Sequence, residues 1–189
     1  MKICLALLIQ YYYEKIDFNQ AWSTQISKSD PERTLTIEGE DSIADAAEKI
    51  MPYLVGGVVI LHSPTLRTRQ SAIVIGEVIG CDNIGTADLR MIGPEFLAAR
   101  ANAGELLGIP AAVVYMRKMH IQPDQIETPA QLVNRFDEIF KSYEEETVIA
   151  VSHEPSIRAF MEAMSGYDVL FKSFESDLLY ADFIVLERK

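Results

Sequence analysis

The chain has 189 residues, of which 49% are hydrophobic and 24% are charged, and its formal net charge is −11. These values are typical of one folded domain and exclude a disordered chain. The acidic balance argues against nucleic acid or an anionic membrane as a partner, because both are bound through basic surfaces. No apolar run reaches the roughly 20 residues of a membrane span. Two cysteines form no disulfide framework, so we expect a cytoplasmic protein.

Short apolar runs predict the strands of a sheet that is covered on both faces. The clearest runs are Ile3–Ile9, Val58–His62, Val148–Ser152 and Phe183–Leu186. They are nearly continuous in Val, Ile and Leu, as is typical of parallel strands buried between two layers of helices. Ala111–Met116 is a weaker strand candidate.

Apolar residues at helical spacing lie between these runs. One pattern spans 43–54 and a second spans 132–143. The second pattern has a clear start signal, with Thr128 as the N-cap, Pro129 at the first helical position and Gln131 placed for a capping box.

A third helical pattern spans 157–164, and Gly166 follows as the predicted stop. The alternation of strands and helices predicts a three-layer α/β sandwich with a mainly parallel sheet. We expect one domain over 1–189. Residues 81–127 contain Gly and Pro and have weak periodicity, which predicts an insertion over one edge of the sheet.

Polar residues follow two of the predicted strands. Arg67 lies within the segment that follows Val58–His62, and His153 directly follows Val148–Ser152. Each segment opens a helix, and the ends of parallel strands beside helix N-termini are sites where anions bind. An arginine fork can hold a phosphate, and an imidazole can donate to a phosphate oxygen or transfer a proton. Taken singly, each residue could instead be a surface arginine or a hydrogen-bonded histidine at a strand end.

Three motifs in register resemble the histidine phosphatase superfamily, which has the phosphoglycerate mutase-like fold. They are Leu35-Thr36-Ile37-Glu38-Gly39, Ser63-Pro64-x-x-Arg67-x-x-Gln70-Ser71-Ala72 and Val151-Ser152-His153-Glu154-Pro155. They resemble, in that order, the turn before the first helix, the phosphate-arginine segment and the second histidine motif. The His-Glu-Pro form and Ser29-Asp30-Pro31-Glu32-Arg33 are most similar to the small phosphohistidine phosphatases. The resemblance implies a phosphate pocket that uses Arg67 and His153, with no cofactor.

The first strand departs from the family pattern. The family has Arg-His-Gly at its end, where the histidine becomes phosphorylated, and this chain has Leu7, Leu8 and Ile9. Leucine has no lone pair with which to attack phosphorus, so the resemblance implies no usual nucleophile. Met91 stands where the family has its acid-base glutamate, and Glu95 is a weak substitute.

Other side chains could restore some chemistry at this edge. His62 and Ser63 end one strand and are weaker candidates for phosphate contacts, and His120 lies in the predicted insertion. The three histidines lack partners at metal-ligand spacing, so we expect no metal site. Ser63 and Ser152 lack the Gly-x-Ser-x-Gly setting of a nucleophile elbow.

The sequence therefore supports three hypotheses. The first is a pseudo-phosphatase that binds phosphate, a phosphorylated small molecule or a phosphorylated protein through Arg67 and His153. The second is an active phosphatase with a relocated nucleophile or a water-based mechanism that uses His62 and His153. The third is an interaction protein without a ligand site, because Leu7 and Leu8 could fill the pocket.

Overall fold

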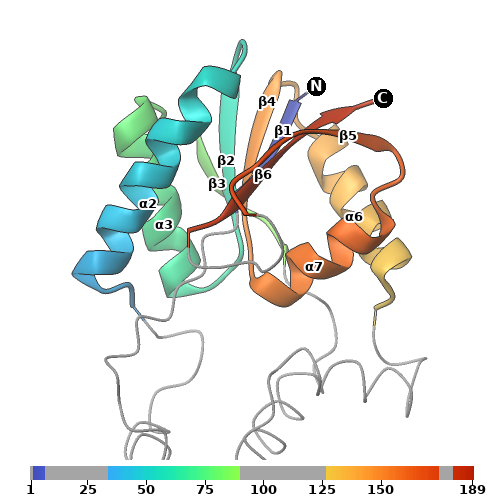
Figure 1. Cartoon of the computed structure of the whole chain (residues 1–189), viewed down its shortest axis with the longest axis horizontal. Coiled ribbons are helices and arrows are strands. Elements are labelled where there is room, and N and C mark those ends of the chain that lie inside the picture. Colours follow the sequence, from blue (N-terminus) through green and yellow to red (C-terminus); the bar gives the residue numbers. More distant parts are fainter. Residues whose placement is uncertain (1, 7–33, 90–126, 175–180) are drawn as a thin grey trace, which may run out of the picture.

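The structure is a computed structural model, which describes residues 2–6, 34–89, 127–174 and 181–189 (Figure 1). The described residues form a six-stranded sheet in the order β3-β2-β4-β1-β6-β5. The strands are β1 Lys2–Ala6, β2 Val58–His62, β3 Ile84–Thr86, β4 Thr147–Val151, β5 Tyr167–Lys172 and β6 Phe183–Arg188. The pairs β1–β4, β2–β4 and β2–β3 are parallel, whereas β6 is antiparallel to both β1 and β5. The predicted mainly parallel sheet is therefore confirmed.

Two layers of helices enclose the sheet (Figure 1). The helices are α2 Ile37–Ile50, α3 Leu66–Ile79, α6 Pro129–Lys141 and α7 Glu154–Ala163. The 3₁₀ turn Met51–Tyr53 extends α2. Helices α2 and α3 lie on one side of the strands, and α6 and α7 lie on the other. The fold is the predicted three-layer α/β sandwich.

Alternating side chains along the strands supply two separate cores. In β2, Val59 and Leu61 pack with Phe136 of α6 and Phe160 of α7. Ile60, between them, packs into the core under α2 and α3. Because successive strand residues point to opposite faces, a strand between two helix layers must be apolar at nearly every position. This explains why the sequence shows runs without alternation.

The helix ends follow the expected chemistry. Thr128 and Gln131 form the predicted capping box, in which Thr128 Oγ1 accepts from Gln131 N at 3.3 Å and Gln131 Oε1 accepts from Thr128 N at 2.9 Å. Helix α3 ends at Gly80, whose φ of 71° is the left-handed conformation that glycine adopts without strain. Helix α7 has its C-cap at Met164, so the predicted stop at Gly166 was wrong by two residues.

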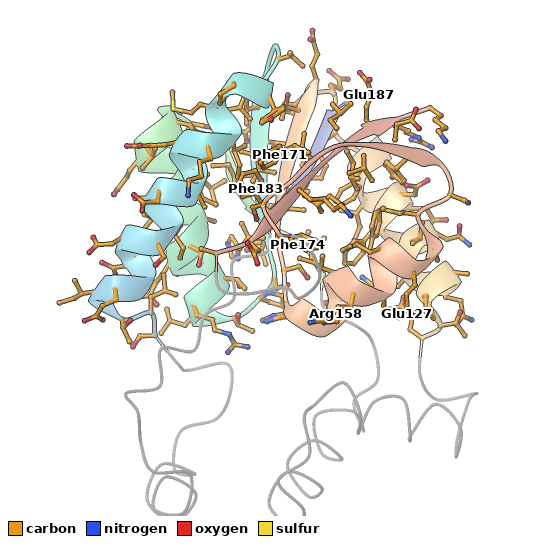
Figure 2. All side chains as sticks on the ribbon, viewed as in Figure 1. Glu127, Arg158, Phe171, Phe174, Phe183 and Glu187 are labelled. Atoms are coloured by element: carbon orange, nitrogen blue, oxygen red, sulfur yellow. The ribbon has the colours of Figure 1, made fainter. Side chains whose placement is uncertain are left out.

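The sequence did not predict the two edge strands, β3 and β5. Strand β3 has only three residues, and most side chains of β5 are exposed, so neither strand carries an apolar run. The pairing of β5 is supported by ring stacking between Phe171 and Phe183, whose centroids are 5.4 Å apart (Figure 2). Residues 84–86 of the predicted insertion belong to the sheet, and 90–126, including the weak strand candidate Ala111–Met116, lie outside the described residues.

Candidate functional site

Three parallel strands end together at one edge of the sheet, called the carboxyl edge below. Ala6 of β1 and His62 of β2 both have Val151 of β4 as their register partner. Ser63 N donates to Val151 O at 3.0 Å, which continues this alignment one residue past β2. Helices α3 and α7 begin at this edge (Figure 1). The fold therefore brings the residues that follow β2 and β4 together.

Arg67 and His153 are in direct contact at the carboxyl edge. Arg67 is the second residue of α3 and is only 3% exposed. His153 is the N-cap of α7 and is half-buried. The distance between Arg67 Nη2 and His153 Nδ1 is 3.2 Å. Two residues separated by 86 positions in sequence thus meet as the strand arrangement predicted.

The Arg67 contact fixes the proton position on the His153 ring. A guanidinium has only donors, so His153 Nδ1 must accept the hydrogen bond with its lone pair. The neutral ring then carries its proton on Nε2. In this tautomer His153 can offer an Nε2–H donor to an anion. The lone pair that would make it a nucleophile is occupied by Arg67.

The turn between β2 and α3 is organised around the carbonyl oxygen of Ser63. This oxygen accepts from Thr65 N at 2.7 Å, from Thr68 Oγ1 at 2.5 Å and from His62 Nδ1 at 2.8 Å. The Ser63 hydroxyl is also buried, and among the described residues it has no hydrogen-bond partner. A buried polar group of this kind is costly unless a partner completes it. That Ser63 contacts a phosphate stays a prediction.

His62 uses both ring nitrogens in contacts with its own neighbourhood. Its Nδ1 donates to Ser63 O, and its Nε2 lies 3.3 Å from the hydroxyl of Thr86 in β3. A carbonyl can only accept, so the neutral ring has its proton on Nδ1 and accepts from Thr86 at Nε2. His62 is 6% exposed. These contacts point to a role in holding the turn and leave no open lone pair for attack on phosphorus.

The residues that follow β3 are hydrogen-bonded to the carboxyl edge. Ala87 N donates to His62 O at 2.9 Å, and the Ser152 hydroxyl donates to Leu89 O. Residues 87–89 are thus attached to the ends of both β2 and β4. The sequence did not predict this role of Ser152, because a hydroxyl beside a histidine carries no pattern that reveals its partner.

The Leu35-Thr36-x-x-Gly39 turn is docked against α3. Leu35 N donates to Gln70 Oε1 at 3.0 Å, and Thr36 Oγ1 accepts from Gly39 N at 3.1 Å. Thr36 thereby caps α2, whereas Gln70 lies one turn after Arg67 on α3. The Leu35–Gly39 motif and the Ser63–Ala72 motif therefore contact each other directly. Sequence reasoning assigned no role to Gln70.

The remaining predicted site residues lie outside the described residues. These are Leu7, Leu8, Ile9, Met91, Glu95 and His120. Within the described ranges, no group of three or more His, Cys, Asp or Glu side chains could hold a metal ion. Every helix that the structure describes is too short or too polar to cross a membrane.

Comparison with known proteins agrees with this fold. The sequence model of the histidine phosphatase superfamily (branch 1) matches residues 18–186. No curated protein sequence matches the chain.

Two solved structures are similar to the fold. One is SixA of Agrobacterium tumefaciens, a candidate phosphohistidine phosphatase, with a TM-score of 0.56 and 16% identity over 99% of this chain and 90% of that one. The other is mycobacterial hydrolase 1, with a TM-score of 0.50 and 16% identity over 85% of this chain and 78% of that one. At this identity the likeness concerns the fold, which is phosphoglycerate mutase-like. The family match covers most of the sequence, and the chain therefore belongs to the histidine phosphatase superfamily, branch 1.

Proposed function

We propose that this protein is a pseudo-phosphatase that binds a phosphorylated ligand through Arg67 and His153 without hydrolysing it. The observation that carries the proposal is the contact between Arg67 Nη2 and His153 Nδ1 at the carboxyl edge. It supports an anion site in a chain in which the resemblance places Leu7, Leu8 and Ile9 at the Arg-His-Gly positions of the family.

The chemistry of the pair suits a phosphate group. Arg67 brings a permanent charge and several parallel donors, which match the oxygens of phosphate. His153 adds an Nε2–H donor in the tautomer set by Arg67. The pair lies at the start of α7, a helix of 10 residues, where the positive end of the helix dipole favours an anion. We infer that a phosphate monoester or a phosphorylated side chain is the ligand.

The contacts of the two described histidines favour binding over turnover. A histidine that attacks phosphorus in line needs an imidazole lone pair that faces the ligand. Among the described residues, the lone pair of His62 faces Thr86 and that of His153 faces Arg67. The resemblance to the family places Leu8 at the position that normally supplies the nucleophile.

Phosphate binding can be tested with two matched arginine variants. Arg67→Met and Arg69→Met each remove one positive charge from the first turns of α3, but Arg67 is buried beside His153 and Arg69 is exposed. Hydrogen bonds from a charged donor contribute about 1.5–3 kcal/mol, so we expect Arg67→Met to weaken the binding of inorganic phosphate roughly 10- to 100-fold. Arg69→Met should change it less than about twofold.

Isothermal titration calorimetry of the three proteins gives the dissociation constants. Equal losses in the two variants would mean that only net charge matters, which contradicts a built site at Arg67. If the wild-type protein binds neither inorganic phosphate nor a phosphohistidine peptide, the third hypothesis, an interaction protein without a ligand site, replaces the proposal.

An active phosphatase is the second candidate function. Membership of the superfamily favours it, because this family is named for phosphatase chemistry. It requires a relocated nucleophile or a water-based mechanism, and His62 at the end of β2 is the candidate among the described residues. Under this hypothesis phosphate release is abolished in His62→Ala. Unchanged release in that variant would reject His62 as the nucleophile.

A further inference from the structure

We propose that His62 is a positioning residue for the phosphate-binding turn and does not touch the ligand. The proposal rests on the phosphate-binding function proposed above. His62 is the last residue of β2 and lies between Val151 of β4 and Thr86 of β3 in the sheet. It is therefore enclosed on both sides by strands, with 6% of its surface exposed.

The proposed positioning role of His62 depends on the proton on its Nδ1 atom. Its Nδ1–H is one of three donors to the Ser63 carbonyl oxygen, at 2.8 Å. The other two come from Thr65, the N-cap of α3, and from Thr68 in the first turn of α3. One oxygen atom thus joins the end of β2 to the start of the helix that carries Arg67.

This arrangement connects His62 to the anion site over a short path. Thr65 O accepts from Arg69 N at 3.1 Å, and Ser71 Oγ donates to Arg67 O at 2.9 Å, so the first turns of α3 are held on both sides of Arg67. A shift of the Ser63 carbonyl would move the start of α3 and change the 3.2 Å contact with His153. His62 therefore sets the Arg67 position through the backbone.

Three substitutions at position 62 distinguish a positioning role from a role in which the side chain only fills space in the core. Asn at position 62 can place an amide N–H where Nδ1–H is, whereas Gln places its amide nearer the position of Nε2. Leu fills the space and donates nothing. We expect His62→Leu and His62→Gln to weaken inorganic phosphate binding about fivefold to tenfold, the effect of one lost neutral hydrogen bond. His62→Asn should restore binding to within about twofold of wild type.

The measurements are phosphate titration, thermal unfolding and amide hydrogen exchange of the same four proteins. If His62 only fills the core, the unfolding temperature and the affinity for phosphate should fall together, and by as much in His62→Asn as in His62→Leu. That result would overturn the proposal. Binding by His62→Leu at the wild-type level would overturn it as well. Recovery of affinity in His62→Asn, without matching recovery of the unfolding temperature, supports it.

Hydrogen exchange keeps this proposal separate from the proposed function. If wild-type protein binds no inorganic phosphate, the phosphate-binding function fails, and the exchange of the Thr65 and Arg69 amides then decides the role of His62. Faster exchange of both amides in His62→Leu than in His62→Asn supports positioning of the turn. Equal exchange in the two variants overturns it.

Discussion

Replacing Gly76 with alanine tests how closely α3 approaches the sheet. A Cβ atom at Gly76 would lie 2.5 Å from the carbonyl oxygen of Cys81 and 3.1 Å from Cδ1 of Ile84. The first contact is with backbone, which cannot rotate away as a flexible side chain can. The same place holds the hydrogen bond from Cys81 N to Gly76 O at 2.9 Å. The added methyl group must therefore push α3 and the Cys81 turn apart.

The size of the effect follows from three opposing contributions. Overpacking costs about 1–3 kcal/mol, and weakening one backbone hydrogen bond costs about 1 kcal/mol more. Alanine gains back about 1 kcal/mol relative to glycine inside a helix. We expect Gly76→Ala to lower the free energy of unfolding by about 1–3 kcal/mol.

Urea denaturation followed by circular dichroism measures this change. The matched control is Gly166→Ala, because a Cβ atom there meets nothing within 4 Å, and its effect should stay within about 0.5 kcal/mol. Gly80→Ala tests backbone strain alone, since its surroundings are equally open but its φ is +71°, and about 1 kcal/mol should be lost. A Gly76→Ala protein as stable as the wild type would refute the close approach of α3 to the Cys81 turn.

Three further predictions concern other parts of the described structure. Arg135→Met should lower the free energy of unfolding by about 1–3 kcal/mol in urea, because it leaves the carboxylate of Glu127, which is 9% exposed, without the 2.8 Å ion pair. Burial and the hydrogen bond to a neighbouring carboxylate raise the pKa of Tyr167 above its usual value of 10.0. The unfolded chain therefore loses this proton first, and stability should fall as the pH rises above about 10, a slope that Tyr167→Phe removes. Long-range ¹H–¹⁵N spectra near neutral pH should show opposite neutral tautomers, with the proton on Nδ1 of His62 and on Nε2 of His153.

Each of these predictions has a comparison that can contradict it. Lys141→Met removes an exposed ion pair with an N–O distance of 3.7 Å and should cost less than about 0.5 kcal/mol, so an equal loss in Arg135→Met would contradict the first. An unchanged high-pH slope in Tyr167→Phe would contradict the second. The same tautomer on both histidines would contradict the contacts described for Arg67 and Ser63.

The sequence was most informative where a local rule acts without help from distant residues. It predicted the bounds of β2 without error and the capping box at Thr128, because apolar continuity and cap chemistry are both local. It also predicted that Arg67 and His153 would lie together, because parallel strands deliver their carboxyl ends to one edge.

The remaining features depend on contacts that no local pattern encodes. The edge strands β3 and β5 pair with the sheet through backbone groups and need no apolar run. The three donors on Ser63 O come from residues whose types alone do not fix their partners. The sequence accordingly predicted His62 as a weak candidate for phosphate contact. Its hydrogen bonds in the structure favour a role in positioning the turn that follows β2.

The most direct test of the central claim is phosphate release from a generic phosphomonoester and from a phosphohistidine peptide, measured for the wild-type protein and for His153→Ala. We expect both proteins to release phosphate only at the rate seen without protein, although the wild type binds inorganic phosphate. Wild-type turnover that is lost in a folded His153→Ala protein would contradict it and would identify a working phosphatase with a different nucleophile.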